Sequence, residues 1–207
     1  MSGSESPPVD ASSTEAQTDH TGTIRWTWLA PRVALLIALA WGDVRTLTDT
    51  ETWNVFAGLT LAVHEGGHLL FGPFGEWLMV AGGSLTQVLA PITAAALLLR
   101  RGDRYGVAIV GTWITYSLTN LAEYIGDARA MALQLVGFSD DPMHDWHYLL
   151  DSVNLLAYDT RLALLVRDLA WLVLLASVAL ATVVLSRQGR AGIVPAAGTP
   201  ADGTPPA

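Results

Sequence analysis

The chain has 207 residues, of which 51% are hydrophobic and 14% are charged, and its apolar residues are gathered into long runs. Such a composition is typical of a polytopic membrane protein. The formal net charge of -8 argues against nucleic acid as a partner, because phosphate binding requires clustered lysine and arginine. Cysteine is absent, which excludes disulfides and thiolate metal sites, so transition-metal ligands must be His, Asp or Glu.

Both ends of the chain lack large apolar side chains. Residues 1–23 are rich in Ser, Thr, Asp and Glu, and residues 188–207 are mostly Ala, Gly, Pro and Thr. Segments of this kind cannot bury enough apolar surface to offset the entropy of folding, so we expect two disordered tails. Residues 24–187 are then expected to form one integral membrane domain.

Five apolar stretches between the tails approach the roughly 20 residues that a helix needs to cross a bilayer. In chain order they are residues 26–42, 53–72, 77–99, 106–125 and 165–185. The first is interrupted by Pro31 and Arg32, so it either crosses the bilayer or lies at its surface. The sequence therefore predicts an all-α bundle of about five transmembrane helices, with a further helix in the outer loop.

The second stretch contains His64-Glu65-Gly66-Gly67-His68, an HExxH pattern. A charged group near the centre of a membrane helix costs roughly 2.5–3.5 kcal/mol, so such residues usually face a functional interior and have partners. Residues four apart lie on one face of a helix, where the two imidazoles can bind one metal ion and Glu65 can act as a general base. The alternative is a structural polar cluster, with the glycines permitting close approach of another helix.

The third and fourth stretches supply further polar groups near the motif. Small residues lead up to Gln87, which we interpret either as a contact at the site or as a residue that joins helices. Asn120 and Asp127 belong to a polar stripe at helical spacing that must face the bundle interior. Asn120 is a candidate for holding an oxyanion and Asp127 is a candidate third metal ligand; the alternative is hydrogen bonding between helices. The stripe consists of Thr112, Tyr116, Asn120, Glu123 and Asp127.

A catalytic zinc site usually has three protein ligands, and the remaining candidates cluster in the loop between the fourth and fifth stretches. An Asp-Pro pair at 141–142 predicts the start of a short helix there. We expect His144 to be the third ligand, with Asp145 orienting it from behind. His147, Asp145 and Asp127 are also candidates for this role, and the competing interpretation of the segment is a helix at the membrane surface.

The arginines predict which end of the bundle is cytoplasmic. Arg100, Arg101 and Arg104 separate the third and fourth stretches, and Arg187 and Arg190 follow the fifth. The positive-inside rule places both groups in the cytoplasm, so the loop that contains residues 126–164 and the end of the second stretch face the other side.

Two segments resemble the site-2 protease family of intramembrane zinc metalloproteases, particularly its small bacterial relatives. They are residues 64–72 (HEGGHLLFG) and residues 82–85 (GGSL), and the likeness covers about 40 residues. The resemblance implies that His64 and His68 bind Zn²⁺, that Glu65 is the general base, and that a membrane protein is cut in the cell membrane of a prokaryote. This chain lacks the family's later Asn-Pro-Asp-Gly-like motif, which supplies a third ligand, and its one Asp-Gly pair is at 202–203.

The sequence thus predicts a membrane-embedded zinc hydrolase, with an intramembrane metalloprotease as the first interpretation. A lipid amide or ester hydrolase would use the same chemistry on another substrate. A metal-binding or metal-transport protein would use His64 and His68 without catalysis, and a structural membrane protein would bind no metal. The lipid bilayer is an expected partner in each case, and a membrane-protein or lipid substrate is expected for the hydrolases.

Overall fold

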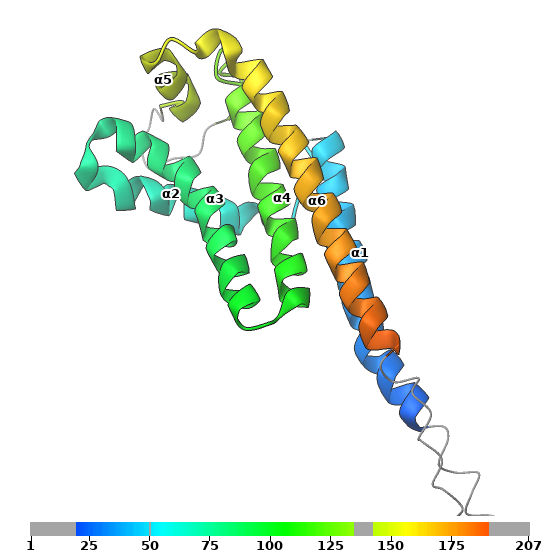
Figure 1. The fold of residues 1–207 in the computed structure, drawn as a ribbon. Coiled ribbons are helices and arrows are strands. Elements are labelled where there is room, and N and C mark those ends of the chain that lie inside the picture. The colour runs from blue at the N-terminus through cyan, green and yellow to red at the C-terminus, as the bar shows by residue number, and fades with distance from the viewer. Residues whose placement is uncertain (1–19, 50, 135–142, 191–207) are drawn as a thin grey trace, which may run out of the picture.

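The computed structural model describes residues 20–49, 51–134 and 143–190, and within these ranges the chain is all-α, without strands (Figure 1). The predicted tails lie outside the described residues, except that residues 20–23 begin the first helix and residues 188–190 end the last one. The elements are α1 (His20–Thr48), α2 (Ala57–Phe71), the 3-10 turn η2 (Gly72–Phe74), α3 (Glu76–Arg100), α4 (Arg104–Gly126), α5 (Asp145–Ser152), the 3-10 turn η3 (Leu156–Tyr158) and α6 (Asp159–Arg190).

Two helical segments of the described chain are long and apolar enough to cross a membrane, namely Glu76–Arg100 and Leu156–Gly189. Helix α2, which carries the HExxH pattern, has only 15 residues, fewer than the roughly 20 that span a bilayer. The prediction of an all-α fold is therefore confirmed, whereas five spanning helices are not.

Helix α2 is shorter than the apolar stretch 53–72 because residues 53–56 are not part of the helix. The side chain of Asn54 accepts a hydrogen bond from the backbone N–H of Phe56 at 3.0 Å and donates one to Asp43 of α1 at 3.2 Å. Local side-chain bonds of this kind compete with the helix, which consequently begins at Ala57.

Helix α4 lies between α3 and α6 and also contacts α1 (Figure 1). Its Gly111 lets α6 approach closely, since a Cβ atom there would lie only 2.0 Å from Oγ of Ser177. Leu118 of α4 packs against Leu47 of α1 and Leu174 of α6 in one buried cluster. These contacts hold α4 in place against α1 and α6.

Helix α2 and the first half of α3 form a hairpin that projects from the bundle (Figure 1). Gly75 makes the turn with a φ of 101°, which favours glycine. The two helices touch at Gly67 and Gly82, because a Cβ on Gly67 would lie 2.2 Å from the carbonyl oxygen of Gly82. This contact fixes the HExxH face of α2 against the small residues of α3.

Large apolar side chains cover much of the outer surface of α3 and α6. Leu89 and Leu97 of α3 are 51% and 52% exposed, and Leu165 and Leu172 of α6 are 66% and 63% exposed. A water-soluble monomer rarely exposes an apolar surface of this extent. Such a surface is usually covered by another molecule, either a protein or a membrane.

Candidate metal centre

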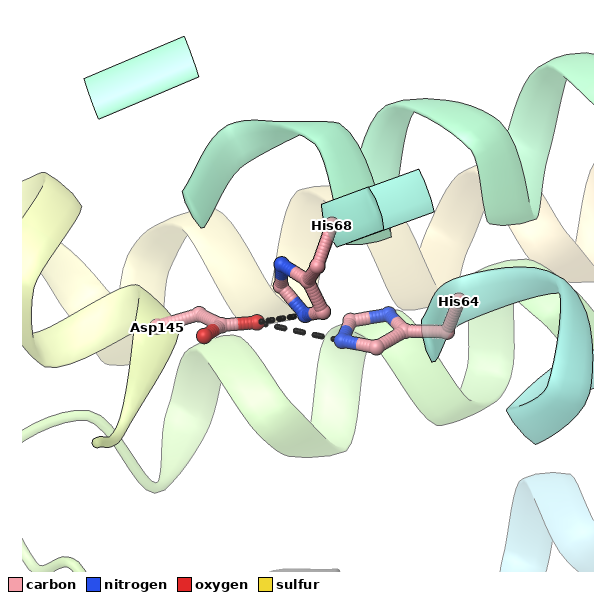
Figure 2. A group of neighbouring side chains, drawn as sticks. All are labelled: His64, His68 and Asp145. Carbon is pink, nitrogen blue, oxygen red and sulfur yellow. Dashed lines mark hydrogen bonds and ion pairs between the residues drawn. The ribbon is translucent and has the colours of Figure 1, made fainter. Parts of the chain in front are cut away.

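His64 and His68 from α2 and Asp145 from α5 bring three ligand atoms together (Figure 2). The Nε2 atoms of His64 and His68 lie 3.1 Å and 3.2 Å from the same carboxylate oxygen, Oδ2 of Asp145. All three atoms lie within 4.8 Å of one another. His64 and Asp145 are buried, and His68 is half-buried.

The hydrogen bonds behind His64 determine which of its ring nitrogens carries the proton. Gln87 donates from Nε2 to the carbonyl oxygen of Ser117 at 3.0 Å and to Oδ1 of Asn120 at 3.1 Å. Both amide protons are thereby used, so the oxygen of Gln87 faces Nδ1 of His64 at 2.9 Å and must accept. Nδ1 of His64 therefore donates, and the neutral ring has its lone pair on Nε2.

His68 is held in the same tautomer by a backbone group. Its Nδ1 lies 2.9 Å from the carbonyl oxygen of Met79 in α3, and a carbonyl oxygen can only accept. The neutral His68 ring therefore also has its lone pair on Nε2. Both rings direct Nε2 at one carboxylate oxygen of Asp145 (Figure 2).

Three acceptors facing one another repel unless positive charge lies among them. Burial acts to raise the pKa of the Asp145 carboxyl, but hydrogen bonds from the His64 and His68 imidazoles in their protonated form outweigh it and hold the pKa below its ordinary value. The carboxylate is thus the charged form, and it requires cationic neighbours in a buried site. Two extra protons on the imidazoles or one metal ion would satisfy this requirement.

The spacing and shape of the cluster fit a metal ion. Zinc bonds of about 2.0–2.1 Å in a tetrahedron separate ligand atoms by roughly 3.3 Å, close to the 3.1 Å and 3.2 Å between the imidazole nitrogens and the carboxylate. Gly83 keeps the adjacent space open, since a Cβ there would lie 2.6 Å from Nε2 of His68 and 2.7 Å from Nε2 of His64. Two imidazoles and a carboxylate are also a ligand set that zinc accepts.

Asp145 reaches the imidazoles because neighbouring helices hold the N-terminus of α5. Its backbone N–H donates to the hydroxyl of Tyr124 in α4 at 2.9 Å. The next residue, Trp146, donates from Nε1 to the hydroxyl of Ser84 in α3 at 3.0 Å. Asp145 thus completes the cluster from a helix far along the chain from α2.

The expected third ligand, His144, does not lie at this cluster. It is the N-cap of α5, where its Nδ1 accepts from the backbone N–H of His147 at 3.2 Å, and its Nε2 faces Oδ2 of Asp127 at 3.2 Å. Both ring nitrogens are engaged. Of the predicted ligands, the structure therefore brings His64 and His68 together with Asp145, and it places His144 outside this group, directly before the first residue of α5.

Asp127 and His147, which the sequence also offered as candidate ligands, form contacts away from the cluster. Asp127 accepts from the backbone N–H groups of Ala132 and Leu133 at 2.9 Å and 3.0 Å, in addition to His144. Burial opposes these bonds, but together they lower the pKa of the Asp127 carboxyl. His147 directs Nδ1 to the carbonyl oxygen of Ala128 at 2.8 Å. Both residues fasten the loop to α5 and are not part of the metal cluster.

Glu65 is half-buried beside the cluster, and its charge acts on His68 and Tyr124. Within the part of the chain that the structure describes, its carboxylate forms no hydrogen bond or ion pair. It is therefore available to exchange a proton with a molecule in the site. Asn120, a candidate for holding an oxyanion, accepts a hydrogen bond from Gln87 at 3.1 Å.

Sequence reasoning missed the carbonyl of Met79 and the hydroxyl of Tyr124, because neither group follows a recognisable motif. Gly83 gave a partial signal, since it belongs to the run of small residues after the HExxH helix. The comparisons with known proteins add nothing to these assignments: no family model, curated protein or solved structure matches the chain.

Proposed function

We propose that this chain is a membrane-embedded zinc-dependent hydrolase, and specifically an intramembrane metalloprotease. The observation that carries the proposal is the convergence of the Nε2 atoms of His64 and His68 on one carboxylate oxygen of Asp145. Gln87 and the Met79 carbonyl fix both tautomers, so the arrangement is built to hold a cation.

Zn²⁺ held by His64, His68 and Asp145 would act as a Lewis acid that polarises a carbonyl and lowers the pKa of water. The uncommitted carboxylate of Glu65 would accept the proton from that water and return it to the leaving amine. Gln87 and Met79 would keep the imidazoles in position throughout.

The surface and the burial of the site support a substrate that reaches it from the membrane. The exposed leucines of α3 and α6 support contact between these helices and lipid. His64 and Asp145 are 8% and 6% exposed, so bulk water has little access to the ligand atoms. A peptide bond within or near the bilayer is the substrate that these features favour.

The proposal is tested with the full chain, reconstituted in liposomes with zinc and a quenched-fluorescent transmembrane peptide library. We expect cleavage by the wild type, none by Glu65→Gln at unchanged zinc content, and neither cleavage nor zinc for His64→Ala. Glu76→Gln is the matched control, since Glu76 is an exposed residue of the first turn of α3.

If the chain cleaves a fluorogenic N-acyl lipid and not the peptides, its substrate is a lipid amide. Metal flux into liposomes that survives Glu65→Gln, without any hydrolysis, would contradict the enzymatic proposal and support transport.

A further inference from the structure

A cavity of about 280 Å³ lies at the end of the bundle where α1 and the start of α4 meet the last turns of α6. Its volume is close to the lower end of the range for small-molecule sites. Three arginines from three different helices line it, together with an aliphatic wall. These residues are Arg32, Arg104, Arg187, Leu180, Val183 and Val184.

Arg32 is fixed by three contacts, although it sits in an apolar stretch of α1. Its Nη1 donates to Oε1 of Gln188 in α6 at 2.9 Å, and its guanidinium lies 5.3 Å from the centre of the Tyr105 ring. The Tyr105 hydroxyl in turn donates to the carbonyl oxygen of Arg32 at 2.8 Å. A guanidinium held in this way loses little further entropy when it binds an anion.

The positive charge of the cavity is not neutralised by the described residues around it. Asp103 also lines the cavity, but its Oδ1 caps α4 by accepting from the backbone N–H of Gly106 at 2.8 Å. None of the ion pairs between described residues includes Arg32, Arg104 or Arg187. Three guanidinium groups against one carboxylate favour an anionic ligand.

The location combines this charge with an apolar surface at the end of a candidate membrane span. Leu180, Val183 and Val184 belong to the last turns of Leu156–Gly189, and Val183 is 45% exposed. Gly102 and Asp103 of the lining lie in the turn after the other candidate span, Glu76–Arg100. A ligand here can place an anionic group among the arginines and an alkyl chain along α6.

We propose that this cavity binds the phosphate group of an anionic phospholipid, with an acyl chain against the aliphatic wall of α6. Arginine suits phosphate because its planar fork can donate two parallel hydrogen bonds. Basic pockets between helix ends at the membrane surface are a recurrent way of recognising lipid headgroups. The inference depends on the membrane location and not on the metal cluster.

The test measures binding of short-chain phosphatidylglycerol to the detergent-purified full chain by native mass spectrometry. The same acyl chains on phosphatidylcholine, and inorganic phosphate alone, serve as comparison ligands. The variant Arg104→Gln with Arg187→Gln removes two cavity arginines. Its matched control is Arg100→Gln with Arg101→Gln, which removes two exposed arginines outside the cavity lining.

We expect phosphatidylglycerol to bind more tightly than phosphatidylcholine and the cavity variant to weaken it about thirtyfold. The control variant should bind almost as the wild type does. Equal weakening by both variants would overturn the site, because it would show attraction to surface charge alone. Full competition by millimolar inorganic phosphate would overturn the lipid assignment and identify a site for soluble phosphate.

Discussion

Gln87 of α3 lies behind His64 of α2, with its Oε1 atom 2.9 Å from Nδ1 of the imidazole. The amide nitrogen of Gln87 donates two hydrogen bonds to α4, one to the Ser117 carbonyl and one to the Asn120 side chain. These bonds fix the orientation of the amide group, so its oxygen faces His64. A residue on one helix thus sets the tautomer of a candidate ligand on another. This relationship makes Gln87 a positioning residue for the candidate metal centre.

Replacing Gln87 by Leu should therefore lower zinc affinity by about 10- to 100-fold, the usual effect of losing a partner behind a ligand. The cause would be a His64 ring free to rotate or to change tautomer. Competition with a chromophoric chelator measures the affinity. Gln188→Leu, at the far end of α6, should leave the affinity unchanged. An unchanged zinc affinity of Gln87→Leu would show that Gln87 does not position His64.

Gly83→Ala should disturb the metal centre without removing a ligand. The new Cβ would lie 2.6 Å from Nε2 of His68 and 2.7 Å from Nε2 of His64, so one of the rings must move. We expect a loss of stability of about 1–3 kcal/mol, as for other overpacked sites, together with weaker zinc binding. Thermal unfolding with and without zinc measures both effects.

Gly66→Ala is the matched control for Gly83→Ala, because a Cβ at Gly66 meets nothing within 4 Å. Alanine is the better helix former by roughly 0.5–1 kcal/mol, so this variant should be at least as stable as the wild type. Equal stability and equal zinc binding of the two variants would show that zinc binding does not need the open space beside the imidazoles.

Trp146→Phe should weaken zinc binding through the placement of α5. Trp146 loses its 3.0 Å hydrogen bond to the Ser84 hydroxyl, which ties α5 to α3 next to Asp145. One such bond is worth about 1 kcal/mol, which corresponds to roughly fivefold in affinity. The control is Trp53→Phe, since Trp53 is 77% exposed. Isothermal titration with zinc distinguishes the two variants, and an equal affinity for both would argue against α5 as the carrier of a ligand.

Arg129→Gln should destabilise the fold, because it leaves a buried carboxylate unpaired. Asp159 is 1% exposed; Arg129 donates a hydrogen bond to it from Nε at 2.8 Å and forms an ion pair with it through Nη2 at 2.7 Å. Breaking one side of such a pair costs more than replacing both sides. The double variant Arg129→Gln with Asp159→Asn should therefore melt at a higher temperature than Arg129→Gln alone. The opposite order of melting temperatures would show that the pair does not hold the start of α6.

The pairing of His64 with His68 was predictable from sequence because it depends only on the helical repeat, and α2 supplies that repeat. The identity of the third candidate ligand depends on the register of α5 and on the path of the loop that leads to it. A shift of one residue turns a side chain by about 100° around a helix, which decides between His144 and Asp145. The sequence contains no information on that register beyond the Asp-Pro pair at 141–142, which lies outside the described residues.

The length of α2 was equally inaccessible from hydropathy. Residues 53–56 are apolar enough to extend the helix, but Asn54 bonds to Phe56 and to Asp43 and thereby prevents it. A bond to a residue on α1 is a tertiary contact, and a window of local sequence does not reveal it. Gln87 was expected either to contact the site or to join helices, and only the structure identifies its partners, which lie on α2 and α4.

The most direct test of the account is the metal content of the detergent-purified chain, determined by elemental analysis. We predict one zinc per chain for the wild type, for His144→Ala and for Asp151→Ala, a change of the same kind on an exposed residue of α5. Asp145→Ala and His64→Ala should contain none. Retention of zinc by Asp145→Ala, above all with its loss from His144→Ala, would contradict the site.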